Sequence, residues 1–174
     1  MPAEAVLAAG LTVGVKLDRA RARRVRRELV RHEAMAKAAR SLTRRDLTQK
    51  ELADRLARNQ VAPFARSEAL ASLVRAGAVD DARFARSRAQ ALAEREAGDA
   101  MIRHDLIGRG IADELVEAAV AELEPEAARA AKIVDLRGSS LRTARRLARK
   151  GFTKDSLEGA CGGAIAEGPP PAVP

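Results

Sequence analysis

One pattern recurs three times in this chain and limits the folds open to it: a leucine is followed five residues later by a large apolar residue. The successive leucines are 50 and 41 residues apart. Repetition at such intervals indicates tandem units, each burying its apolar face against its own helices and its neighbours. The pairs, each with the apolar residue of the preceding helix, are Leu56/Val61 after Leu52, Leu106/Ile111 after Ile102, and Leu147/Phe152 after Ala144.

The residue types in the chain favour helices. The 174 residues include no Trp or Tyr and three Phe, whereas Ala, Leu, Arg and Glu, all good helix formers, are abundant. We therefore predict an all-α fold: an elongated array of three tandem three-helix repeats with an N-terminal basic helical extension. The predicted segments are 1–33 (extension), 34–79, 80–123 and 124–161 (repeats) and 162–174 (disordered tail).

The extension combines two kinds of local structure. Leu11–Leu17 alternates weakly between apolar and polar residues, which predicts a short extended segment or hairpin. Asp18 is the predicted N-cap of a helix whose apolar stripe is only Val25 and Leu29, so loose docking is expected. The arginines around that stripe are Arg19, Arg21, Arg23, Arg24, Arg26, Arg27 and Arg31.

Capping signals divide the rest of the chain into helices. Gly77 is suited to end a helix, and Asp80 or Asp81 to cap the next one, which should turn Phe84 into the core. Other predicted caps are the capping box Thr48–Glu51, Ser139 or Ser140, and Thr153.

The centre of the chain carries a family signature: Val79–Ala85, Arg95, Gly98, Ile102, Leu106 and Arg109–Ile111. These residues resemble the RecX family of small bacterial regulators of the RecA recombinase, and the resemblance runs from about Leu11 to Ala160. It implies tandem three-helix repeats. It also implies binding to RecA along the groove of its DNA filament, and inhibition of the recombinase and ATPase activities in DNA repair, recombination and the SOS response. The chain departs from the family at Asn59-Gln60-Val61, which replaces a glycine turn; Asn59 is expected to take the left-handed conformation.

The net charge of +8 is unevenly distributed along the chain. Residues 1–47 have a net charge of +7, residues 80–123 of −4 and residues 124–174 of +3. A basic–acidic–basic chain suits a partner of mixed charge, such as protein assembled on nucleic acid. The alternative is that the arginines reflect a GC-rich coding bias and lie on solvated faces.

We predict no enzyme activity, catalytic residue, cofactor or metal site. His32 and His104 lack partners at metal-ligand spacing, and no glycine pair precedes Lys-Ser/Thr as in a phosphate-binding loop. Thr48–Leu56 resembles the first helix of a helix-turn-helix DNA reader, but Ala57 continues the helix where the turn should be. The single Cys161, the absence of a signal sequence and the absence of long apolar runs predict a soluble, cytoplasmic protein.

The strongest candidate binding surface is the middle helix of the third repeat. Leu141, Ala144, Leu147 and Ala148 are expected to face inward, which leaves a positive face able to bind phosphates or carboxylates. An ordinary solvated helix face remains the alternative. The candidate partner-binding residues are Arg142, Arg145, Arg146, Arg149 and Lys150, with Arg103 and Arg109 as a sparser second group.

These observations support two hypotheses of function. The first, by resemblance, is a monomeric, non-enzymatic regulator that binds RecA or the RecA–DNA filament and inhibits its activity. The second is a basic helical module that binds nucleic acid without RecA, although aromatic platforms for single-strand stacking are scarce.

The predicted array can be tested in solution. Repeats that contact mainly their neighbours should give a mostly helical circular dichroism spectrum and a scattering profile longer than that of a sphere of equal mass. A compact, spherical profile would contradict the array, and a strong β signal would contradict the fold class.

Overall fold

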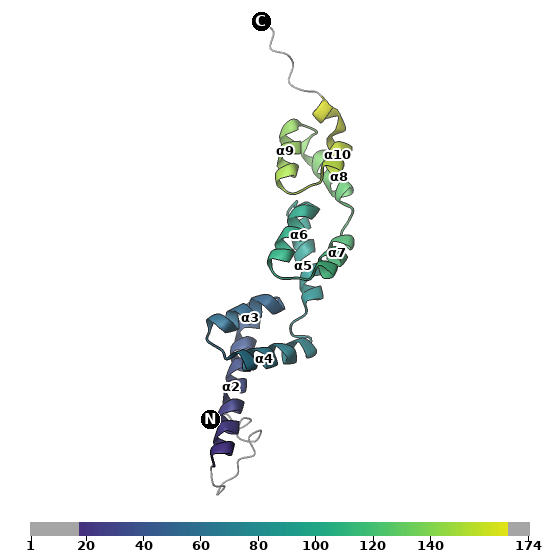
Figure 1. The fold of residues 1–174 in the computed structure, drawn as a ribbon. Coiled ribbons are helices and arrows are strands. Elements are labelled where there is room, and N and C mark those ends of the chain that lie inside the picture. Colours follow the sequence, from purple (N-terminus) through teal and green to yellow (C-terminus); the bar gives the residue numbers. More distant parts are fainter. Residues whose placement is uncertain (1–17, 167–174) are drawn as a thin grey trace. The chain divides into compact units, whose positions relative to one another are not determined.

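The computed structural model describes residues 18–166, with side chains as far as Gly162. This part of the chain forms nine helices and no strand (Figure 1), so the all-α prediction is confirmed. The segment Leu11–Leu17 and the side chain of Ala164 lie outside the described residues. The helices are α2 (Arg19–Leu42), α3 (Gln49–Arg58), α4 (Pro63–Arg75), α5 (Asp81–Ala93), α6 (Asp99–Gly108), α7 (Asp113–Ala121), α8 (Glu126–Arg137), α9 (Leu141–Arg149) and α10 (Lys154–Ala166).

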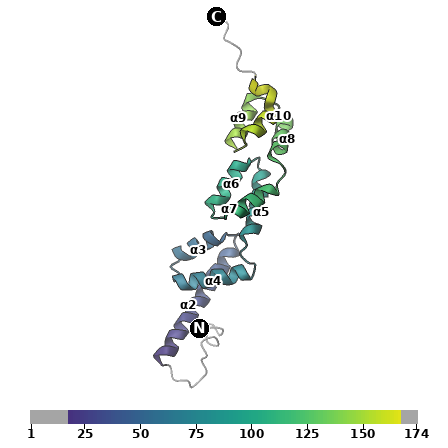
Figure 2. The same cartoon turned by 45° about the vertical axis from the view of Figure 1, so that its right-hand side comes forward.

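The chain divides into two compact units, one ending at Asp80 and the other beginning at Asp81. The first holds α2–α4. The second holds α5–α7 and α8–α10, and α8, α9 and α10 lie together in both views (Figures 1 and 2). Helices in sets of three match the predicted repeats, while α10 continues to Ala166, past the boundary predicted at Gly162.

The recurring leucine pairs mark the C-terminal ends of the middle helices. The N–H of the residue five positions on returns to the leucine carbonyl, which is the 6→1 hydrogen bond of a Schellman motif. The two side chains of each pair meet in the core, so one motif both ends a helix and anchors the segment that follows. The three bonds are Val61 N to Leu56 O (3.1 Å), Ile111 N to Leu106 O (3.2 Å) and Phe152 N to Leu147 O (3.2 Å).

Each of these motifs needs one residue in the left-handed region. Gly110 (φ 78°) and Gly151 (φ 84°) supply it in the second and third repeats. In the first repeat Gln60 does so, at φ 56°, and Asn59 stays at φ −84°. The prediction for Asn59 was therefore wrong by one residue, because the hydrogen-bond pattern requires the left-handed residue four positions after Leu56.

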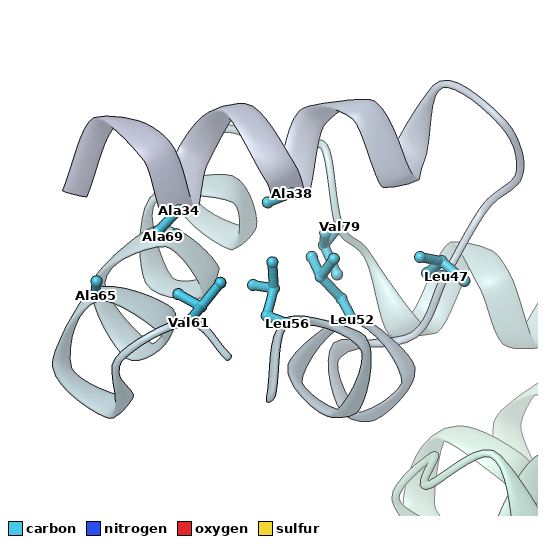
Figure 3. Close-up of a cluster of buried hydrophobic side chains, with 9 residues drawn as sticks. All are labelled: Ala34, Ala38, Leu47, Leu52, Leu56, Val61, Ala65, Ala69 and Val79. Atoms are coloured by element: carbon cyan, nitrogen blue, oxygen red, sulfur yellow. The ribbon is translucent and has the colours of Figure 1, made fainter. Parts of the chain in front are cut away.

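The core of the first unit is built from alanines on α2 and branched residues on α3 (Figure 3). Small side chains on α2 allow the other helices to approach closely, while Leu52 and Leu56 are fully buried. Burial of each leucine contributes about 1.5–3 kcal/mol. The buried set is Ala34, Ala38, Leu47, Leu52, Leu56, Val61, Ala65, Ala69 and Val79, and Leu73 packs against it.

The predicted basic helix is the beginning of α2. Asp18 caps it as expected, since its Oδ1 accepts a hydrogen bond from Arg21 N at 2.8 Å. α2 then runs without a break through the boundary predicted between residues 33 and 34. The extension and the first helix of the first repeat are thus one continuous helix.

The second unit has two apolar clusters, one for each set of three helices. Phe84 was predicted to be core but is half-buried, because the fully buried Ala85 and Ala89 form the inner face of α5. Its ring lies at the edge of the cluster, 5.9 Å from the Arg109 guanidinium carbon. The first cluster is Ala85, Ala89, Ala97, Ile102, Leu106, Ile111, Val116, Ala119 and Val120, with Leu123 packed against it; the second is Ala130, Ile133, Val134, Ala144, Leu147, Phe152, Leu157 and Cys161.

Two further predicted caps are confirmed. Thr48 Oγ1 accepts from Glu51 N at 3.1 Å, and Ser140 Oγ accepts from Thr143 N at 3.2 Å. No helix in the described part of the chain is long and apolar enough to cross a membrane.

Gln60 provides a direct test of the turn geometry. The left-handed conformation costs a residue with a side chain about 1–2 kcal/mol. Glycine avoids this cost, but part of the gain is offset because glycine makes the unfolded chain more flexible. We expect Gln60→Gly to raise the free energy of unfolding by about 0.5–1 kcal/mol in urea denaturation. Asn59→Gly is the control, since right-handed Asn59 has no such strain to relieve. Equal or lower stability of Gln60→Gly would contradict the assignment.

Candidate partner-binding surface

α9 carries the predicted arginines, but the residues that it buries differ from those expected. Thr143, Ala144 and Leu147 are its buried residues, whereas Leu141 is 43% exposed and Ala148 is also exposed, so those two predictions were wrong. Leu141 and Leu147 are six residues apart, about 120° around the helix, and cannot both face one core. Thr143 lies only about 40° from Leu147, and its hydroxyl is satisfied by Ser140 Oγ at 3.0 Å.

Three arginines of α9 face solvent together. Arg142, Arg145 and Arg149 are exposed, and their spacing of i, i+3 and i+7 places them on one side of the helix. Within the described residues, no carboxylate lies within 4 Å of any of them. We call these three residues the α9 basic face.

The other two predicted cations of this region are bound within the second unit. Arg146 Nη2 pairs with Glu96 Oε2 at 2.7 Å, and Arg137 Nη2 with Glu96 Oε1 at 2.5 Å. Lys150 Nζ donates to the carbonyl of Arg95 at 3.2 Å. The Arg137 hydrogen bond, helped by Arg146, lowers the pKa of Glu96 despite partial burial. Arg146 and Lys150 therefore tie α9 to the turn between α5 and α6.

Arg103 and Arg109 also have partners inside the unit. Arg103 makes a two-pronged pair with Glu117 on α7, at 2.8 and 3.0 Å. Arg109 Nε lies 2.9 Å from Asp105, which also receives two hydrogen bonds from Arg88. The Arg88 hydrogen bonds and then Arg109 lower the pKa of Asp105 to about 2. Arg103 thus links α6 to α7, whereas Arg109 pairs within the end of α6, with the carboxylate that Arg88 of α5 also binds.

A buried glutamate holds the two repeats of the second unit together. Glu126, in the first turn of α8, accepts from the backbone N–H of Asp99 (2.7 Å) and of Thr153 (3.0 Å). It also accepts from the hydroxyls of Thr153 (2.5 Å) and Ser156 (2.8 Å). Burial alone would raise the pKa of Glu126, but these hydrogen bonds outweigh it and the pKa is lowered. One carboxylate therefore caps both α6 and α10.

Arg129, one turn further along α8, reinforces this junction. Its guanidinium donates to the Ala97 carbonyl at 2.7 Å and the Glu124 carbonyl at 3.0 Å, and it pairs with the Asp99 carboxylate. It also lies 5.7 Å from the centre of the Phe152 ring. Burial raises the pKa of Asp99, against the attraction of Arg129.

Sequence reasoning identified neither Glu126 nor Arg129. Each is one charge among many on a helix, and no local pattern marks which charged residues a neighbouring repeat will bury. Their burial, at 9% exposure each, appears only once α8 packs across the start of α6 and α10.

The contact between the two repeats of the second unit also explains why residue 98 is a glycine. Its N–H donates to the Lys150 carbonyl at 2.8 Å, and Ala100 N donates to the Gly151 carbonyl at 3.1 Å. A Cβ on Gly98 would lie 2.2 Å from Phe152 N and 2.3 Å from Gly151 C. The two backbones approach so closely that only glycine fits.

Comparisons with known proteins support the resemblance found in the sequence. Residues 80–120 match the family described as RecX, second three-helix domain. The fold is similar to a crystal structure of regulatory protein RecX, with a TM-score of 0.76 at 19% identity, covering 89% of this chain and 83% of that one. It is also similar to RecX from Lactobacillus salivarius, with a TM-score of 0.67 at 19% identity, covering 79% of this chain and 98% of that one. No curated protein matched the sequence.

The close approach at Gly98 predicts a position-specific effect. Gly98→Ala would force backbone apart and should destabilise the protein by about 1–3 kcal/mol. Gly108→Ala, in the last position of α6, meets nothing within 4 Å and should be neutral or stabilising by up to about 1 kcal/mol. Thermal and urea denaturation of both variants check this. Equal stabilities of the two variants would mean that the backbone around Gly98 can move apart without loss of stability.

Proposed function

We propose that this protein regulates the RecA recombinase, because residues 80–120 match the second three-helix domain of RecX and the described fold is similar to that of RecX. In this proposal it binds RecA, or the RecA–DNA filament, in the cytoplasm and inhibits ATP hydrolysis and recombination without catalysing a reaction itself. The family match carries the proposal. The structure adds a candidate contact surface on the same unit.

We place the contact at the α9 basic face. A guanidinium binds carboxylates and phosphates through two parallel N–H groups, and a RecA–DNA filament offers both kinds of anion. Arg142, Arg145 and Arg149 can take such partners without breaking an ion pair within the described chain. The bonds of Arg146 and Lys150 to the α5–α6 turn limit the motion of α9, which reduces the entropy lost on binding.

The two compact units suggest how filament is favoured over free subunits. Units joined in one chain can attach at two points, and the second attachment is then intramolecular. A filament presents repeated sites along its length, whereas an isolated subunit presents one. We therefore expect stronger binding to filament than to free RecA.

The alternative, binding to nucleic acid without RecA, would use the same positive charge. The two hypotheses differ in whether binding to DNA requires RecA. A RecA regulator should bind naked DNA more weakly than the RecA–DNA filament, and a nucleic-acid module should bind both equally or prefer naked DNA. Comparing the two substrates at equal salt separates them.

Reversing the charge of the α9 basic face should weaken inhibition. The variant Arg142→Glu/Arg145→Glu/Arg149→Glu replaces attraction with repulsion, while each exposed change alters stability by only about 0.5 kcal/mol. We expect loss of inhibition of DNA-dependent ATP hydrolysis by RecA, and weaker salt dependence than in the unmodified protein. The measurement is ATP turnover titrated with each folded protein.

A charge-matched control separates position from net charge. Arg40→Glu/Arg44→Glu/Arg58→Glu changes three exposed arginines of the first unit by the same amount. This control should retain inhibition. Equal inhibition by both triple variants and the unmodified protein would rule out the α9 face, and no effect of the unmodified protein on RecA would rule out the proposed function.

A further inference from the structure

A second basic surface, separate from the α9 basic face, lies in the first unit, at the N-terminal half of α2. Arg23, Arg26, Arg27 and Val30 of α2 and Phe64 of α4 line a shallow groove of about 480 Å³. We call it the α2 groove. Its three guanidiniums surround two apolar side chains.

The groove continues the face of α2 that forms the core of this unit. Ala34 and Ala38 are buried against α3 and α4 at 1% and 0% exposure. One and two turns earlier the same side of the helix carries Val30 and Arg27, and then Arg23. In Figures 1 and 2, α2 extends beyond α3 and α4 in this direction. The described residues therefore cover this helix face further along the helix but not here, where it changes from neutral to basic.

Glu68, the one acidic residue of α4, is shared between two arginines of α2. Glu68 lies 2.7 Å from Arg31 Nη2 and 3.6 Å from Arg27 Nη2. Its hydrogen bond with Arg31 lowers the pKa of Glu68. From Asp18 to Gly162, no carboxylate lies within 4 Å of Arg23 or Arg26. The pairs between α2 guanidiniums and the α4 carboxylate do not extend past Arg27 toward the start of α2, and Arg23 and Arg26 remain for an outside carboxylate.

The apolar part of the groove is Phe64 with Val30. Phe64 is 40% exposed, one of the largest exposed apolar side chains in the described chain, and Arg27 lies 5.3 Å from the centre of its ring. It belongs to the first turn of α4, which contains no acidic residue, so the positive end of the helix dipole adds to the local field. Arginine with exposed aromatic area is the composition enriched in protein–protein contacts.

We propose that the α2 groove binds an acidic segment of a partner protein that also carries one large apolar side chain. Carboxylates of the segment would pair with Arg23 and Arg26, and the apolar side chain would pack on Val30 and Phe64. The proposal goes beyond regulation of RecA, because it depends on the first unit alone and names a ligand chemistry.

Charge and shape favour this occupant over others. A nucleic-acid strand would match the arginines but would gain little from Val30, and one face of the only aromatic ring here is already covered by Arg27. Residues 1–17 of this chain contain a single acidic residue, Glu4, so they do not complement three guanidiniums.

The test uses the full chain and synthetic probes. A fluorescein-labelled peptide of glutamates with one central leucine is titrated with protein, and binding is followed by fluorescence anisotropy. We expect Arg23→Glu/Arg26→Glu to weaken binding about tenfold or more, since two attractions become repulsions. Phe64→Ala, at an exposed position, should weaken it severalfold. A peptide with alanine in place of leucine should bind the unmodified protein as weakly as the leucine peptide binds Phe64→Ala.

Two controls show whether the effect belongs to the groove. Arg40→Glu/Arg44→Glu/Arg58→Glu, at exposed positions outside the groove, should bind the leucine peptide as the unmodified protein does, and circular dichroism verifies folding of each variant. Equal loss in this variant would mean nonspecific charge attraction and overturn the proposal. So would absence of peptide binding, or tighter binding of oligothymidylate that depends on Arg23 and Arg26 but not on Phe64. No assay here contains RecA, so this result and that of the proposed function are distinguishable.

Discussion

Helix termination by a left-handed residue is the constraint on which the rest of this structure depends. The last carbonyls of a helix have no partners inside it, and leaving them buried and unpaired is costly. In both units a residue at positive φ lets the following N–H groups return to those carbonyls, and the chain reverses onto the helix it has just left. In the part of the chain that the structure describes, five such turns close helices, at Gln60, Gly77, Glu96, Gly110 and Gly151.

Glu96 shows how one turn joins local and tertiary structure. It has a positive φ of 61°, which is unfavourable for a residue with a side chain. Its carboxylate binds Arg137 and Arg146, so the turn that ends α5 also holds α8 and α9. Together with Glu126, which caps helices of both repeats, it orients α9. The two anchored cations and the three solvent-facing arginines thus have separate roles on one short helix.

Several features could be read from the sequence because they arise from neighbouring residues. The leucine pairs identified the helix ends, since the Schellman hydrogen bonds link residues five apart. Thr48 and Ser140 were recognised as caps because a cap acts within one turn. The resemblance to RecX rested on the same local signature. The inward face of α9 was less accessible, because four apolar residues on a short helix allow more than one register and only packing selects Thr143 over Leu141.

By itself, the sequence determined the helical class, the turns after the middle helices and the three-helix periodicity, because each follows from backbone hydrogen bonds and side-chain spacing within a few residues. Only the tertiary structure decided which charges serve the fold and which remain for a partner. Arg129 and Arg142 are the same residue type on neighbouring helices. Arg129 is buried and bonds to Ala97 and Asp99, whereas Arg142 faces solvent. The difference lies in what another repeat places within hydrogen-bonding distance, and that distance is not a property of the local sequence.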